Sequence, residues 1–99
     1  MPNPNVVHDA AEVQRALRER LGHAQVHVKP YGQHLLIQMD DAGELDTVAR
    51  ITRFDAKTYG AAFRTHSGRW EPLPDEGTRA EMVDLVISEF GPYLVPDNY

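Results

Sequence analysis

The feature that most constrains the fold is a change of hydrophobic period along the chain. Apolar residues recur at helical spacing near both ends and alternate with polar residues in between. Helical spacing puts one apolar stripe on a helix, whereas alternation puts the apolar side chains of a strand on one face. The chain is therefore predicted to be an α+β domain, with an antiparallel meander sheet of four to five strands between an N-terminal and a C-terminal helix. Packing both helices on one sheet face buries these apolar surfaces most simply.

The N-terminal helix is predicted over residues 9–21, after a Pro- and Asn-rich segment, residues 1–8, that we expect to be flexible. Asp9 suits the N-cap position, with Glu12 three residues later as in a capping box. An apolar stripe follows at four-residue spacing, formed by Val13, Leu17 and Leu21. Gly22 suits the left-handed residue that ends many helices, so we expect the helix to end just before it.

The C-terminal helix is predicted over residues 78–90. Thr78 and Glu81 form a second capping-box pattern, and Gly91-Pro92 is expected to end the helix. Its apolar face is broad and consists of Met82, Val83, Leu85, Val86, Ile87 and Phe90. A single sheet contact does not need so much apolar surface. Part of this face is therefore a candidate binding surface for a second copy of the protein or for another chain, formed by Met82, Leu85, Val86 and Phe90.

The first two strands are predicted on either side of a turn at Tyr31-Gly32. This turn pairs Val28 with Leu35. It also pairs Val26 with Ile37, so the apolar residues of both strands share one face. We expect that face to belong to the core. The opposite, solvated face then holds Gln25, His27, Lys29, His34, Leu36 and Gln38.

Strands three and four are predicted over residues 47–54 and 58–65, and each of their two faces could be buried. Pairing Phe54 with Tyr59 gathers the aromatic side chains on one face. That face consists of Val48, Arg50, Thr52, Phe54, Tyr59, Ala61, Phe63 and Thr65. The other face consists of Ala49, Ile51, Arg53, Gly60, Ala62 and Arg64. Gly60, inside a strand, suggests a bulge or a close backbone approach.

A short fifth strand is predicted after a tight turn at Ser67-Gly68. In this register Trp70 stands opposite Thr65, and Pro72 and Pro74 end the strand. If the helices cover the small-residue face, the aromatic face stands open as a candidate binding surface. Its residues would be Arg50, Phe54, Tyr59, Phe63 and Trp70. If the helices cover the aromatic face, nothing unusual is exposed, and we favour this second arrangement because aromatic residues dominate protein cores.

The sequence contains no coherent catalytic set and no metal-ligand pattern. His27 and His34 would be diagonal neighbours without a third ligand, and His66 next to Ser67 does not make a catalytic pair, because successive strand side chains point apart. The acidic segment 40–46 lacks the spacing of a calcium loop and is expected to be a solvated connection. No cysteine is present, which excludes disulfides, thiol nucleophiles and sulfur-ligated zinc. We therefore expect no metal and no cofactor, and an enzyme is disfavoured.

The 99 residues suit one domain, which we place at residues 9–95 with a tail at 96–99. The net charge of −5 lies in the last third of the chain, because residues 71–99 carry one basic and seven acidic groups. This balance disfavours general nucleic-acid binding, which requires neutralisation of phosphates. The chain has no apolar run of about 18 residues and no signal-like start, so we expect no membrane association and a cytoplasmic location.

These observations favour a small non-catalytic binding or regulatory module that acts through contact with another protein, including self-association as a homodimer. The alternative is a module that binds nucleic acid or a small anion on an open aromatic and arginine-bearing sheet face. A third hypothesis is a small enzyme, or a subunit of one, with its site at an interface between protomers. No sequence motif identifies a family.

Overall fold

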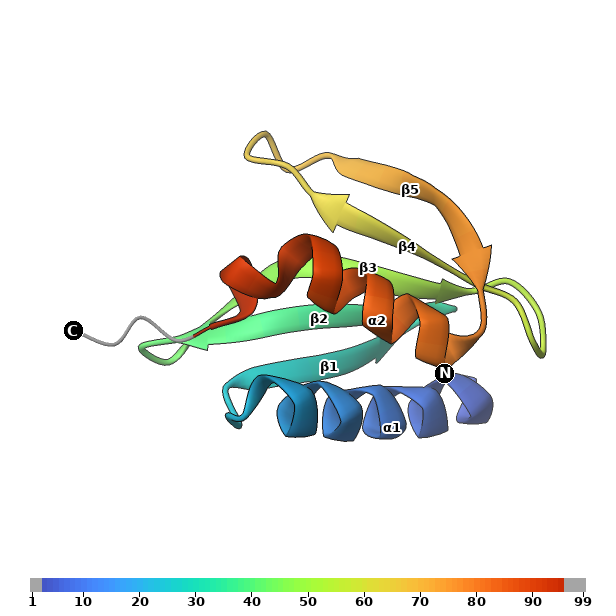
Figure 1. The fold of residues 1–99 in the computed structure, drawn as a ribbon, viewed down its shortest axis with the longest axis horizontal. Coiled ribbons are helices and arrows are strands. Elements are labelled where there is room, and N and C mark those ends of the chain that lie inside the picture. The colour runs from blue at the N-terminus through green and yellow to red at the C-terminus, as the bar shows by residue number, and fades with distance from the viewer. Residues whose placement is uncertain (1–2, 96–99) are drawn as a thin grey trace.

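The structure, a computed structural model, describes residues 3–95. The predicted tail at 96–99 and the first two residues of the predicted flexible segment lie outside the described residues. Helices and strands follow one another in the predicted order (Figure 1). The elements are α1 (Pro4–Leu21), β1 (Val26–Tyr31), β2 (His34–Asp41), β3 (Glu44–Arg53), β4 (Tyr59–Arg64), β5 (Trp70–Gly77), α2 (Arg79–Phe90) and a 3-10 helix, η1 (Gly91–Leu94).

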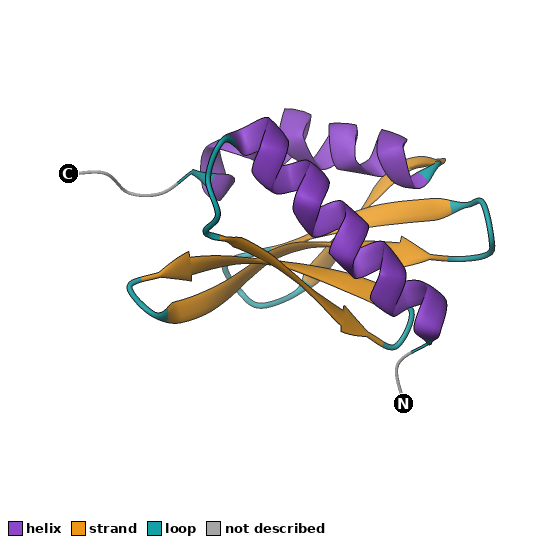
Figure 2. Cartoon of the chain, turned by 90° about the horizontal axis from the view of Figure 1, so that it is seen from below, coloured by secondary structure: helices purple, strands orange, loops and turns teal. Residues whose placement is uncertain are grey.

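The five strands form one antiparallel sheet in the order β1-β2-β3-β4-β5, so every strand pairs with its neighbour in the sequence. Both helices lie on the same side of this sheet (Figure 2). The predicted α+β architecture is therefore confirmed, including the meander and the placement of the helices. We call the side of the sheet that packs against α1 and α2 the covered face, and the other side the open face.

The first helix begins at Pro4 rather than at Asp9. Asn3 is the N-cap, because its side chain accepts a hydrogen bond from the backbone N–H two residues further on. Proline suits the first helical position, where its missing N–H would have had no partner. The apolar stripe extends back accordingly to Val6, which is fully buried. The N-cap prediction for Asp9 is wrong: this residue lies inside the helix and is itself buried.

The first hairpin turns one residue later than predicted, with Tyr31 paired to His34 across the turn. Val28 consequently pairs with Ile37 rather than with Leu35. The partner moves by two residues, and a shift of two residues leaves every side chain on its original face. The predicted pairings are therefore wrong, whereas the predicted core face of this hairpin is correct.

The acidic segment 40–46 is exposed to solvent over most of its length, as predicted, but it is not a loop. β2 and β3 continue through it to a two-residue turn at Ala42-Gly43. Both turn residues have positive φ, 53° and 91°, as in the turns whose twist suits a β-hairpin. The Asp40 carboxylate accepts a hydrogen bond of 2.9 Å from the Gly43 N–H. The β2–β3 hairpin is thus longer than expected and projects at one end of the sheet (Figure 1).

The pairing of β3 with β4 differs from the predicted one by a single residue, because Tyr59 pairs with Arg53 and not with Phe54. A shift of one residue moves a strand's side chains to the opposite face. The covered face therefore combines members of both predicted faces: Ala49, Ile51, Arg53, Tyr59, Ala61 and Phe63. The open face combines the remaining ladder residues: Arg50, Thr52, Gly60 and Ala62. Neither predicted alternative for this strand pair is correct.

The β3–β4 connection accounts for this register. The Asp55 carboxylate accepts hydrogen bonds of 2.8 Å from the N–H groups of Lys57 and Thr58. The Phe54 N–H donates to the Thr58 carbonyl. These bonds fold Phe54 and Thr58 into the turn itself, so the first ladder pair falls one residue further into β3.

The fifth strand continues through Pro72 and Pro74 instead of ending there. It is an edge strand, where a proline can replace a residue whose N–H would face solvent. Trp70 pairs with Arg64 rather than standing opposite Thr65, and this one-residue difference puts Trp70 on the open face. The ladder between β4 and β5 is irregular between Gly60 and Ala62, which confirms the bulge suggested at this glycine.

The C-terminal helix agrees closely with prediction. Thr78 is its N-cap, the capping box with Glu81 is complete, and the helix ends at Phe90 before Gly91-Pro92. At about 1.5 Å per residue, the 12 residues of α2 span about 18 Å, whereas the ten residues of β3 span about 34 Å. α2 is therefore too short to cover β3 along its whole length. The covered face stays partly open at the end where the β2–β3 hairpin projects.

The hydrophobic core fills the space between the helices and the covered face. Its larger buried side chains are Val6, Val13, Leu17, Val26, Val28, Leu35, Ile37, Met39, Ile51, Tyr59, Met82, Val83, Val86 and Leu94. At about 25 cal/mol per Å² of buried apolar surface, such a core is the main stabilising contribution in a domain of this size.

Candidate functional site

The structure separates the five residues that the sequence grouped on one sheet face. Tyr59 is buried and Phe63 half-buried on the covered face. Arg50 and Trp70 lie on the open face, as does Phe54, whose ring packs against the outer side of Gly60 there. The one-residue shift between β3 and β4 is the reason for this division.

The apolar face proposed on the last helix is mostly part of the core. Met82 and Val86 are fully buried, whereas Leu85 and Phe90 remain half-buried against the core. Of the four residues proposed as a binding surface, only Leu85 and Phe90 therefore keep exposed apolar area. Only Phe90 of these two lies beside a hollow in the surface where other apolar side chains gather.

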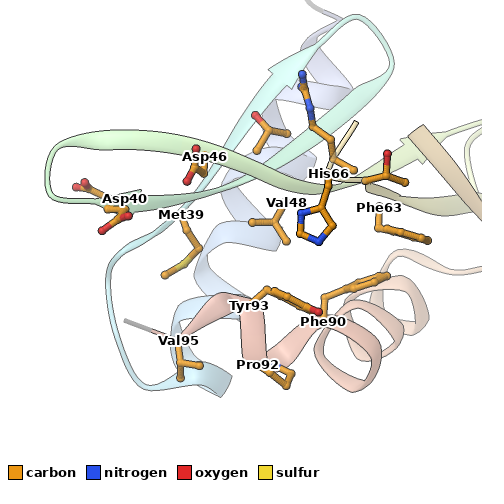
Figure 3. A pocket seen from close by; sticks show the side chains of 14 residues that line it. Met39, Asp40, Asp46, Val48, Phe63, His66, Phe90, Pro92, Tyr93 and Val95 are labelled. Atoms are coloured by element: carbon orange, nitrogen blue, oxygen red, sulfur yellow. The ribbon is translucent and has the colours of Figure 1, made fainter. Parts of the chain in front are cut away.

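That hollow is a groove of about 840 Å³ at the uncovered end of the sheet, between the β2–β3 hairpin, the end of β4 and η1 (Figure 3). It is lined by Met39, Asp40, Asp41, Asp46, Thr47, Val48, Phe63, Arg64, Thr65, His66, Phe90, Pro92, Tyr93 and Val95. The volume falls in the range of pockets that hold a small ligand or a few side chains of a partner. The groove exists because the helix layer ends before the sheet does.

The inner wall of the groove is apolar. Phe63 from β4 and Phe90 from the end of α2 pack together with ring centroids 5.3 Å apart and a tilt of 35°. Val48 lies beside them in the groove (Figure 3). Because both phenylalanine rings are only half-buried, an apolar side chain entering the groove would contact surface that is now exposed to water.

The outer wall of the groove is η1, which one histidine holds in place. The carbonyl of Leu94 lies 2.5 Å from His23 Nε2, and a carbonyl can only accept, so Nε2 carries the proton. His23 Nδ1 accepts the Gln25 N–H at 3.1 Å, which fits the same neutral tautomer. Leu94 is fully buried under this bond, while its neighbours Tyr93 and Val95 are 67% and 53% exposed.

The two ends of the groove differ in charge. At the hairpin end, the groove is lined by the carboxylates of Asp40, Asp41 and Asp46. The other end is bordered by His66 (Figure 3) and by Arg64, whose guanidinium carbon lies 5.9 Å from the Trp70 ring on the open face. Within the described chain, the salt bridges formed by basic side chains involve other acidic residues, so none neutralises these three aspartates. A ligand in the groove would therefore meet negative potential at the hairpin end.

A second polar cluster lies at the opposite end of the molecule, around the buried carboxylate of Asp9. Its Oδ1 accepts a hydrogen bond of 2.7 Å from Arg79. Its Oδ2 accepts bonds of 3.0 Å from Arg53 and 2.9 Å from the Tyr59 hydroxyl. Burial, followed by the hydrogen bond to Asp9, raises the pKa of Tyr59 above its usual value of 10.0. Every oxygen of Asp9 is engaged within the fold, so this cluster joins α1, β3, β4 and α2 rather than forming a reactive site.

The open face carries a third arrangement. The guanidinium carbon of Arg50 lies 4.5 Å from the centroid of the Trp70 ring, and that of Arg64 lies 5.9 Å away. His34 is on the same face, where its Nδ1 is 2.8 Å from the Thr52 hydroxyl. Partial burial, and secondarily the positive charge of Arg50, lower the pKa of His34 below its usual value of 6.5.

Residues 3–95 contain no group of three or more His, Asp or Glu side chains arranged to hold a metal ion. Over the same residues, neither helix combines the length and apolar character needed to cross a bilayer. The groove, with its apolar inner wall and acidic hairpin end, suits noncovalent binding.

No protein-family description, curated protein or solved structure matches this chain.

One feature of these sites, the buried carboxylate of Asp9, has a signal in the sequence. Asp9 stands within the apolar stripe, since Val6 and Val13 lie three residues before and four residues after it. A carboxylate on the buried face of a helix must find buried partners, which would have indicated Arg53 and Arg79 as candidates. The groove has no such local signal, because it is built by three elements far apart in the sequence.

Proposed function

We propose that this protein is a non-catalytic binding module that takes a short segment of another protein chain into the groove between the β2–β3 hairpin and η1. The observation that carries this proposal is the pair of exposed apolar side chains, Tyr93 and Val95, beside the half-buried rings of Phe63 and Phe90. Apolar side chains gathered around a concave surface are typical of interaction sites, and covering them removes apolar area from water.

The charges around the groove indicate the chemistry of the partner segment. Asp40, Asp41 and Asp46 at the hairpin end favour a Lys or Arg of the partner. The apolar inner wall of the groove favours one or two apolar anchor residues in the partner, such as Leu, Met or Phe. A segment with apolar anchors and an adjacent basic residue therefore fits this groove best. The net charge of −5 would steer such a basic segment toward the protein. A cytoplasmic location for this module remains a prediction from the sequence.

Self-association is the competing use of the same surface. Leu85 and Phe90, the half-buried members of the predicted helix surface, flank different sides of α2, and Phe90 alone borders the groove. A homodimer would therefore have to use the groove rather than the helix face as a whole. We expect a monomer in sedimentation equilibrium at micromolar concentration. If the protein is instead a dimer, and Tyr93→Ala converts it to a monomer, then a second copy of the chain occupies the groove.

The test is a selection of random peptides, about 12 residues long, displayed on phage against the folded protein. We expect enriched peptides to combine apolar residues with Lys or Arg, and to bind Tyr93→Ala at least about tenfold more weakly. Tyr31→Ala is the matched control, because Tyr31 is 65% exposed, nearly as much as Tyr93 at 67%, but lies in β1. Peptides that bind both variants equally well would contradict the proposal.

A further inference from the structure

The open face carries two cations that no acid of the described chain neutralises. Arg50 and Arg64 approach the same indole ring, that of Trp70, with their guanidinium carbons 4.5 and 5.9 Å from its centroid. The ion pairs present among residues 3–95 involve Arg15, Arg20, Arg53 and Arg79 instead. Two cations beside one ring repel each other, and a bound anion would offset that repulsion.

The sheet register explains how this pair is assembled. Arg50 stands opposite Ala62, and Trp70 lies on the next strand, so the arginine side chain must extend across β4 to reach the ring. The methyl group of Ala62 leaves room for it. Arg50 Nε is enclosed by this packing and has no hydrogen-bond partner. A buried N–H without an acceptor is uncommon in folded proteins and costs free energy. This packing therefore fixes the Arg50 guanidinium next to Trp70 and leaves its Nε–H without a hydrogen-bond acceptor.

Further cationic and aromatic groups on the same face indicate an extended ligand. Lys29 lies on the same rung of the sheet as Arg50, with Leu36 between them, so the two residues are about 10 Å apart. Phe54 is 54% exposed and packs its ring against Gly60, at a site where a Cβ would lie 2.6 Å from the ring. Separated positive charges interleaved with exposed aromatic rings suit a chain of phosphates and bases. A single oxyanion would use only the arginine pair.

We propose that the open face binds single-stranded nucleic acid, with phosphate groups at Arg50 and Arg64 and a base stacked on the exposed part of Trp70. This site lies on the opposite face of the sheet from the groove, and Arg64, at the end of β4, borders both. Of the acidic side chains, Glu76 reaches the central rungs of this face, opposite Gly60, and would limit the affinity. The excess of acidic over basic groups lies in residues 71–99, which carry seven acidic groups and one basic group.

The test is fluorescence anisotropy with a fluorescein-labelled oligothymidylate of about 12 nucleotides. Arg50→Gln should weaken binding about tenfold and reduce the slope of log affinity against log salt by about 0.7. Arg15→Gln is the matched control, since it removes the same charge from a side chain that is 64% exposed on α1. We expect this control to bind within about twofold of the unmodified protein. Equal losses in the two variants, or no binding by the unmodified protein, would overturn the proposal.

A second set of measurements separates nucleic acid from other anions. Trp70 is the only tryptophan, so its fluorescence reports this face directly. Oligothymidylate should quench it, whereas polyglutamate and inorganic phosphate should not compete at equal charge concentration. Equal competition by polyglutamate, or unchanged Trp70 fluorescence in the presence of oligothymidylate, would refute the proposal.

Discussion

The guanidinium of Arg79, the first residue of α2, donates a hydrogen bond of 2.7 Å to the carboxylate of Asp9, which is only 2% exposed inside α1. The pair links the two ends of the sequence. The remaining Asp9 oxygen accepts hydrogen bonds from Arg53 on β3 and Tyr59 on β4. One buried acid thus connects both helices with the middle of the sheet. Its contribution to folding is testable apart from any binding activity.

Asp9→Asn should destabilise the protein by about 3 kcal/mol, because it leaves two arginines facing each other around a neutral amide. The measurement is urea unfolding followed by circular dichroism. Asp84→Asn is the control, since Asp84 forms an exposed pair with Arg20 between the same two helices. That change should cost less than about 1 kcal/mol. Equal losses of unfolding free energy in the two variants would show that the buried cluster stabilises the fold no more than the exposed ion pair does.

Alkaline pH should destabilise the protein through Tyr59. Its pKa is raised in the folded state, so folding favours the protonated phenol. The associated stability is complete below the unfolded pKa, near 10, and is lost as the pH rises through the higher folded pKa. Tyr59→Phe should be less stable at neutral pH, by about 1–3 kcal/mol, but should lose less stability between about pH 9 and pH 11. Tyr31→Phe, at an exposed position, should follow the unmodified protein. If the free energy of unfolding depends on pH in the same way in all three proteins, Tyr59 does not cause the loss of stability at alkaline pH.

Gly60→Ala should destabilise the sheet, because the new methyl group would lie 2.6 Å from the Phe54 ring. We expect a cost of about 1–3 kcal/mol. Phe54→Ala removes the ring and therefore the steric clash. The double variant, Phe54→Ala with Gly60→Ala, should then be no less stable than Phe54→Ala alone. This double-mutant cycle is read from thermal or urea unfolding. Additive losses would show that Phe54 does not pack on Gly60.

His23 should stabilise η1, the outer wall of the groove. His23→Ala removes the bond to the Leu94 carbonyl and the acceptor for the Gln25 N–H. We expect faster amide hydrogen exchange at Gln25 and throughout η1. His8→Ala, at an exposed position on α1, is the control. Unchanged exchange in His23→Ala would contradict this role.

The sequence predicts the architecture well because its helices and turns have local signals. The Thr78 capping box, the Gly91-Pro92 stop and the alternating pattern of the first hairpin are all confirmed in outline. The first hairpin also shows why a wrong register can leave the core correct: its pairing differs by two residues, and a shift of two preserves the faces.

The candidate sites were harder to predict because they depend on a shift of one residue. Because of the hydrogen bonds around Asp55, Tyr59 pairs with Arg53 instead of Phe54. The faces of β3 are therefore reversed relative to those of β4. Periodicity alone does not contain this information, since both registers alternate equally well. The groove depends on the relative lengths of α2 and β3 and on the position of η1, which are properties of the assembled fold.

The central claim, that the groove receives a segment of another protein, is tested most directly by mapping a bound peptide on the protein's ¹H–¹⁵N spectrum. A peptide enriched in the display selection is titrated into the labelled protein. We expect the largest shift changes at Val48, Phe63 and Tyr93, and little change at the open-face residues Arg50 and Trp70. Shift changes confined to the open face or to the outer surface of α1 would contradict the claim.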